Sequence, residues 1–174
     1  NIVIFFSNSD LNNFGYKILD LICKYKHISV TLITGINSPV FKNYKKIQSS
    51  KNIKIINFEK NFEKIIKNTT LFIGSCGSTY INRIYYNIPS IVFKLSENQE
   101  TFCNFVEANK LGIYLGSELK FKKEVFLNTF SNLIKNKKKL INISDNCKGK
   151  IDSYSINRIL EAVNPSNFNI AKLK

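Results

Sequence analysis

Short apolar runs alternate with amphipathic stretches along the whole chain. The runs are rich in Ile, Val and Phe and are bounded by turn-forming residues, a pattern typical of strands that are covered on both faces. We interpret the following segments as β-strands: Ile2–Phe6, Ser29–Thr34, Ile53–Asn57, Leu71–Gly74, Ser90–Lys94 and Ile113–Leu115.

The stretches between these runs carry apolar residues at the spacing of one helix face. In Asn12–Tyr25, for example, Phe14, Ile18 and Leu21 fall on one stripe. The predicted helices are Asn12–Tyr25, Val40–Ser49, a short one around Phe62–Ile66, Thr79–Tyr86 with Asn87 as its left-handed end, Glu100–Leu111, Lys122–Lys137 and Ser155–Val163. Because strands that alternate with helices form parallel βαβ units, we expect an α/β fold: a three-layer Rossmann-like domain with a parallel sheet of about six strands.

The chain has 174 residues, of which 44% are hydrophobic, and a net charge of +14. This supports one sizeable core, and we interpret residues 1–163 as one domain and 164–174 as a C-terminal tail. The Lys residues are spread along the chain without a nucleic-acid-binding signature, so the charge favours anionic partners in general and no specific nucleic acid. No apolar run reaches the length of a transmembrane segment.

The 4 cysteines contain no C-x-x-C pair and the chain has 1 His, so we expect no metal site. Without a secretion signal, reduced thiols and a cytoplasmic location are expected. His27 precedes a strand, at the sheet edge opposite the expected site, and is not expected to be catalytic. The chain contains no Met, and we interpret it as a piece of a longer protein.

In a parallel sheet of this kind the ligand lies beyond the carboxyl ends of the strands, at the point where the strand order reverses. The loop after the fourth strand, Gly74–Thr79, consists of small residues that let a ligand approach the backbone. It leads into a helix start, where free N–H groups suit a diphosphate. An ordinary small-residue turn, with Ser78 or Thr79 as the helix N-cap, is the alternative.

Polar residues also follow the other strands. After the fifth strand come Ser96, Glu97, Asn98 and Gln99, which suit sugar hydroxyls or a nucleotide, or else cap the next helix. Ser7–Asp10 and Gly35–Pro39 follow the first and second strands and have no specific signature by themselves. The Lys135–Lys139 run is interpreted as the solvated end of a helix.

Several of these segments together match one family pattern. They are Gly77-Ser78-Thr79, Asn87-Ile88-Pro89, Glu97-Asn98-Gln99 and Asn104, with Ser9-Asp10 near the start and residues 150–153 and 157–159 near the end. With these motifs, about residues 1–163 resemble the C-terminal half of the UDP-sugar hydrolase of pseudaminic acid biosynthesis. That enzyme removes UDP from UDP-2,4-diacetamido-2,4,6-trideoxy-β-L-altropyranose and is similar in fold to the GlcNAc transferase of peptidoglycan lipid intermediates.

The resemblance implies that the chain is the UDP-sugar-binding half of a GT-B-type enzyme, which has two Rossmann-like halves and needs no cofactor. The catalytic His of the family lies in its N-terminal half, so this chain alone is expected to be inactive. The implied nucleotide- and sugar-binding residues are Ser9, Asp10, Gly35, Asn37, Cys76, Gly77, Ser78, Thr79, Asn82, Glu97, Asn98, Gln99 and Asn104.

Two positions depart from the family pattern. The Gly-Gly of the first loop is Ser7-Asn8 here, and Asn82 stands where relatives have a Glu that holds the ribose hydroxyls. Asn keeps hydrogen-bonding groups but loses the charge-assisted bonds. Two other functions therefore stay open: a GT-B glycosyltransferase domain that uses an acceptor in place of water, and a non-catalytic sugar-nucleotide-binding or assembly domain.

Overall fold

A computed structural model of the chain describes residues 1–8, 10, 12–35, 51–58 and 62–163. Its strands form one sheet in the order β3-β2-β1-β4-β5-β6, and every neighbouring pair is parallel. The strands are β1 (Ile2–Phe5), β2 (Val30–Thr34), β3 (Ile53–Asn57), β4 (Leu71–Ser75), β5 (Ser90–Lys94) and β6 (Ile113–Ser117). The predicted strands and the predicted α/β class are confirmed.

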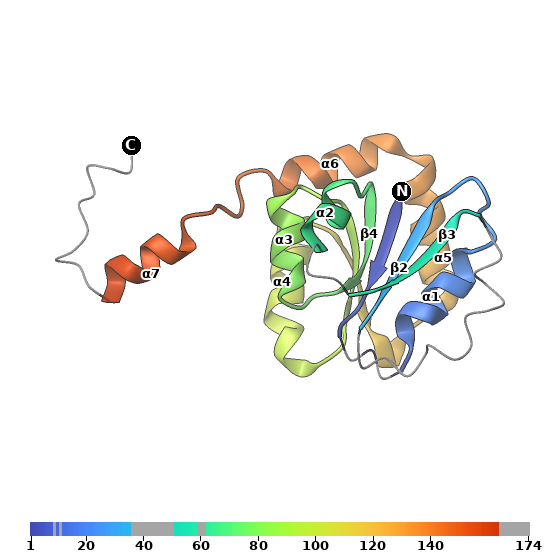
Figure 1. The fold of residues 1–174 in the computed structure, drawn as a ribbon, viewed down its shortest axis with the longest axis horizontal. Coiled ribbons are helices and arrows are strands. Elements are labelled where there is room, and N and C mark those ends of the chain that lie inside the picture. The colour runs from blue at the N-terminus through green and yellow to red at the C-terminus, as the bar shows by residue number, and fades with distance from the viewer. Residues whose placement is uncertain (9, 11, 36–50, 59–61, 164–174) are drawn as a thin grey trace.

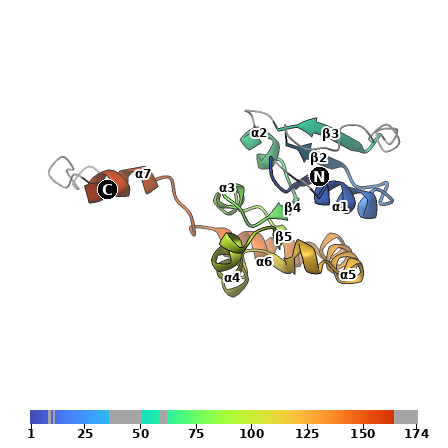
Figure 2. The same ribbon diagram turned by 90° about the horizontal axis from the view of Figure 1, so that it is seen from below.

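Helices cover both faces of the sheet (Figures 1 and 2). They are α1 (Phe14–Ile22), α2 (Phe62–Lys67), α3 (Thr79–Tyr85), α4 (Glu100–Ala108), α5 (Lys123–Lys135), α6 (Lys137–Cys147) and α7 (Ser155–Val163), with 3-10 turns η3 (Glu97–Gln99) and η4 (Glu118–Lys120). Apolar residues of α1 and α5 share one core cluster, whereas those of α2 and of α3 with α4 form two others. The three-layer arrangement is thereby confirmed.

The alternation of side chains along each strand explains the separate clusters. In β1, Ile2 and Ile4 belong to the cluster with α1 and α5, whereas Val3 and Phe5 belong to the cluster with α2. All four residues are buried, as the continuous apolar run of β1 predicts for a central strand.

The structure corrects one helix boundary. The predicted helix Lys122–Lys137 corresponds to α5 and ends earlier, because Asn136 leaves the helical region with φ −121° and ψ 84°. A further helix, α6, which was not predicted, begins directly after Asn136. The Asn136 side chain accepts a hydrogen bond from the Lys139 N–H, so Asn136 caps α6. Within the run Lys135–Lys139, Lys135 therefore ends α5, as predicted, whereas Lys137 and the lysines after it begin α6. The predicted helix Val40–Ser49 lies outside the described residues.

Helix α7 stands apart from the layers in both views, joined to α6 by an extended segment (Figures 1 and 2). It carries exposed apolar side chains, among them Ile159, Leu160 and Val163. The predicted span of its helix is confirmed, and the division into a domain of residues 1–163 and a tail stays a prediction.

Candidate functional site

The sheet reverses its strand order between β1 and β4, and a cleft lies at this switch point. The chain runs outward from β1 toward β2 and β3, and outward from β4 toward β5 and β6, so the loops after β1 and β4 diverge. The cleft measures about 650 Å³. Its lining residues are Phe5, Phe6, Ser7, Asn8, Phe58, Ser75, Cys76, Gly77, Ser78, Thr79, Ile81, Asn98, Gln99 and Phe102.

The loop after β4 is anchored at its base. Ser75 is buried, and its Oγ donates a 2.5 Å hydrogen bond to the carbonyl oxygen of Phe6, which ties the end of β4 to the end of β1. The Cys76 N–H donates to the carbonyl oxygen of Phe93 at 3.1 Å. These bonds fix the backbone at the point where it leaves the sheet and enters the cleft wall.

Beyond that anchor the loop presents free donors. The backbone N–H groups of Gly77, Ser78 and Thr79 donate to no other group in the part of the chain that the structure describes. Ser78 is exposed and makes no capping hydrogen bond with its side chain, so the ordinary N-cap that the sequence left open is not formed. Three consecutive N–H groups and a hydroxyl are therefore available to an anion in the cleft.

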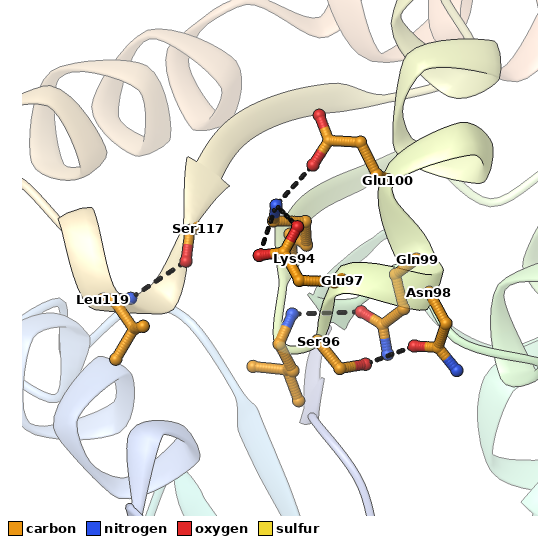
Figure 3. Close-up of polar contacts among 9 residues, drawn as sticks. Lys94, Ser96, Glu97, Asn98, Gln99, Glu100, Ser117 and Leu119 are labelled. Carbon is orange, nitrogen blue, oxygen red and sulfur yellow. Dashed lines mark hydrogen bonds and ion pairs between the residues drawn. The ribbon is translucent and has the colours of Figure 1, made fainter.

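At the end of β5 some polar side chains form ion pairs with each other, whereas others line the cleft (Figure 3). Lys94 Nζ contacts both Glu97 oxygens, at 3.0 and 2.9 Å, and also pairs with the Glu100 carboxylate. These ion pairs raise the pKa of Lys94, with the bond to Glu100 contributing most. The predicted site residue Glu97 is thus engaged by Lys94, although its side chain is exposed, and it does not line the cleft.

The side chain of Gln99 is oriented by the backbone of Leu95. Its Oε1 accepts a 3.0 Å hydrogen bond from the Leu95 N–H, which directs the amide Nε2 toward Gly77. Asn98 accepts a 2.5 Å hydrogen bond from Ser96 Oγ on its Oδ1, leaving its amide nitrogen exposed. Both residues line the cleft, and the Gln99 amide nitrogen faces the loop after β4 at Gly77.

The loop after β1 uses its carboxylate internally. Asp10 accepts hydrogen bonds from the Phe14 N–H at 2.9 Å and the Gly15 N–H at 2.8 Å, which caps α1. Burial raises the pKa of Asp10, and these two hydrogen bonds oppose the rise. Asp10 therefore neutralises the α1 N-terminus, and it lines a smaller neighbouring pocket with Ser7 and Gln99. Ser9 lies outside the described residues.

Several other predicted site residues do not line the cleft. A Cβ on Gly35 would lie 2.0 Å from the Asn8 carbonyl oxygen, so Gly35 packs under the first loop and is not in the cleft wall. Asn82 lines a second pocket of about 460 Å³, separated from the cleft by Ile81, which lines both. Asn104 is exposed on α4 and is not among the lining residues. Asn37 lies outside the described residues.

Apolar walls of the cleft were not predicted as site residues. Phe58 follows β3 and stacks on Phe5 at a centroid distance of 5.2 Å, while Phe102 of α4 stands near Gln99 in the chain. Both are partly buried. The signal available in the sequence was their position after a strand or in the first turn of a helix, which does not distinguish a cleft wall from ordinary core.

The cleft wall contains no acid–base group among its described residues: no His, Asp, Glu or Lys lines it. Cys76 lines it, but burial raises the pKa of its thiol, so it is neither a nucleophile nor a base at neutral pH. His27 lies at the other end of the strands, beside Asn1 and Thr70, as expected. Within the described residues, no cluster of His, Cys, Asp and Glu is arranged to hold a metal ion.

In the described part of the chain, no helix combines the length and apolar character needed to cross a membrane. No family model matches the sequence, and no curated protein matches it either. Solved structures do match the fold.

MurG of Acinetobacter baumannii superposes with a TM-score of 0.75 and 11% identity over 95% of this chain and 49% of that chain. WaaG, a glycosyltransferase involved in lipopolysaccharide biosynthesis, superposes with a TM-score of 0.71 and 10% identity, over 94% of this chain and 47% of that chain. Anabaena HepE in complex with UDP-glucose superposes with a TM-score of 0.68 and 13% identity, over 95% of this chain and 48% of that chain. The chain spans about half the length of these proteins, and it has the Rossmann-like fold of one half of a GT-B structure.

Proposed function

We propose that the chain binds a nucleoside diphosphate sugar, with UDP as the nucleotide, in the cleft at the β1/β4 switch point. The observation that carries this proposal is the row of unpaired N–H groups at Gly77, Ser78 and Thr79. Backbone donors of this kind bind phosphate oxygens without any loss of side-chain entropy. The Ser78 hydroxyl adds a fourth donor to the same wall.

The cleft offers a different surface to each part of a UDP-sugar. Phe58 provides an aromatic wall at the β3 side, suited to a flat base. The loop after β4 lies in the middle and suits the diphosphate. Asn98 and Gln99 lie at the β5 side with amide donors, suited to sugar hydroxyl or acetamido groups. The order base, diphosphate and sugar thus follows the order of strands β3, β4 and β5.

The reaction that we propose is hydrolytic removal of UDP from an activated amino-deoxy sugar, as in pseudaminic acid biosynthesis. The described cleft wall supplies binding groups, and in the proposed reaction a second Rossmann-like half contributes the base that activates water. The match to 49% of the MurG chain is in keeping with such a partner half. The chain alone is then expected to bind UDP and to be catalytically inactive.

A glycosyltransferase is the second candidate, because WaaG, a solved structure with a related fold, is a glycosyltransferase. In that case an acceptor hydroxyl would replace water. A non-catalytic binding domain is the third, and the absence of acid–base groups in the described cleft wall favours it over a complete enzyme. All three share the diphosphate site.

Calorimetric titration of the 174-residue chain with UDP, UMP and uridine tests the shared site. We expect UDP to bind more tightly than UMP, and uridine to bind most weakly, because the loop after β4 recognises phosphate oxygens. Equal affinity for UDP and uridine would overturn the proposal.

Product analysis of the longer protein with a UDP-amino-deoxy sugar then separates the activities. UDP released in the absence of an acceptor supports the hydrolase. Release that requires an acceptor supports the transferase, and no release under either condition supports the binding domain.

A further inference from the structure

Arg83 of α3 lies directly behind the loop after β4. Its side chain is fully buried, at 0% exposure, and among the described residues it is the one charged residue in the buried class. Its Nη2 donates a hydrogen bond to the carbonyl oxygen of Ser75, the residue that opens the cleft wall. The guanidinium lies between two rings, 4.4 Å from the centroid of Phe72 and 4.2 Å from that of Tyr80.

The guanidinium is only partly satisfied. Its Nε and Nη1 are buried and have no hydrogen-bond partner. None of the described carboxylates forms an ion pair with it. Burial lowers the pKa of Arg83 to about 10, so the group is still protonated at neutral pH.

Its ionisable neighbours do not supply a negative charge. Burial raises the pKa of the Tyr80 phenol and of the Cys76 thiol well above their ordinary values, so both are neutral. An unpaired buried cation is destabilising, because the lost hydration is not replaced by an opposite charge. Such a group is commonly found where its cost is offset by a functional role.

We propose that Arg83 is a positioning residue for the anion site, an internal cation whose counter-charge is the diphosphate bound on the other side of the Ser75–Gly77 backbone. The inference rests on the proposed function and adds the source of its electrostatic selectivity. In this role Arg83 does not touch the ligand, and its positive charge acts on the diphosphate electrostatically across the loop backbone. The low-dielectric core around it preserves its field, which bulk water would screen at the surface.

The variant Arg83→Met tests this role, because methionine fills an apolar site and removes the charge. We expect the unliganded variant to unfold at the same temperature or a higher one than the wild type, since a buried unpaired charge is gone. We expect UDP affinity to fall by roughly tenfold, the effect of one cation at this range, and uridine affinity to be unchanged. A purely structural role would instead lower the unfolding temperature and leave the ratio of UDP to uridine affinity unchanged.

Lys138→Met is the matched control. It removes the same charge from an exposed position on α6, and UDP affinity should change by less than about twofold at physiological salt. Arg83→Lys is the rescue variant, because it retains the charge, and it should keep most of the UDP affinity. Arg83→Met with wild-type UDP affinity would overturn the proposal.

A measurement on the wild-type chain covers the case in which Arg83→Met does not fold. The sequence has only two arginines, Arg83 and Arg158, so the Nε–Hε region of a nitrogen–proton NMR spectrum contains two signals. UDP should shift the Arg83 signal, and uridine should leave it in place. If UDP binds and the Arg83 signal does not move, the role of Arg83 is wrong while the nucleotide site stands. If UDP does not bind the wild type, the proposed function itself fails.

Discussion

Replacing Gly77 with alanine separates folding from ligand binding. The φ angle of Gly77 is not in the left-handed region. A Cβ at this position would lie 3.5 Å from Ser75 Oγ and 3.6 Å from Gln99 Nε2, which are ordinary van der Waals distances. The fold therefore accepts the methyl group. Because alanine restricts the unfolded chain, the free energy of unfolding should rise by about 0.4–1 kcal/mol.

The same methyl group points into the space where the diphosphate is proposed to lie. It stands between Ser75 and Gln99, at the part of the loop whose N–H groups are free. Displacing the phosphate removes at least one hydrogen bond to a charged group, which is worth about 1.5–3 kcal/mol. UDP affinity should therefore fall by roughly 10- to 150-fold.

Calorimetry with UDP measures the affinity, and thermal unfolding without ligand measures the stability. Asn128→Ala is the control, since it introduces an alanine at an exposed position of α5, on the opposite layer, and should leave UDP affinity unchanged. A Gly77→Ala protein that is stable and binds UDP as tightly as the wild type would refute a diphosphate at this loop. A less stable protein would show that the loop is packed more tightly than the structure indicates.

Three further predictions concern single groups near the cleft. Gln99→Glu keeps an acceptor for the Leu95 N–H but replaces the donor that faces the cleft, so UDP-sugar affinity measured by calorimetry should fall at least about tenfold with little change in unfolding temperature. The raised pKa of Asp10 means that the folded chain holds this proton more tightly than the unfolded chain, so the stability of the wild type relative to Asp10→Asn should decrease as the pH rises above the ordinary pKa of an Asp carboxyl, about 4. An increase would show that the hydrogen bonds to α1 outweigh burial. Iodoacetamide at neutral pH should modify only the half-buried Cys23 in the native chain, as measured by mass spectrometry. Labelling of Cys76, Cys103 or Cys147 in the native chain would contradict the burial of these three thiols.

Much of the fold follows from the sequence because four of the six strands, β2, β1, β4 and β5, are central in the sheet and largely buried. A run such as Ile2–Phe5 has no polar position, so neither its strand character nor its burial is ambiguous. Helix α6 was not predicted because its sequence has few apolar residues to mark a buried face. Its first turn is three lysines and its apolar residues are few, so the break at Asn136 was visible only through backbone angles.

The site was predictable at the level of loops and not of side-chain roles. Parallel topology brings the ends of β1, β4 and β5 together, so Gly77, Ser78 and Gln99 share one cleft as expected. The polar groups that the fold uses internally could not be recognised from sequence. Asp10 caps α1 and Glu97 holds Lys94, and both roles depend on rotamers and neighbouring elements.

Arg83 illustrates the same limit from the other direction. An arginine on a surface helix is ordinarily solvated, and the sequence of α3 does not distinguish that case from a buried cation. Tyr80 and Ile84, which flank its helical position, are both buried, and this stripe was the available signal.

The most direct test of the diphosphate site is a titration of the labelled chain with UDP, followed through the backbone N–H resonances. The account predicts that the amide signals of Gly77, Ser78 and Thr79 shift most, and that uridine at the same concentration shifts them much less. Saturating UDP that leaves these three signals in place, or that moves only signals elsewhere in the chain, would contradict it.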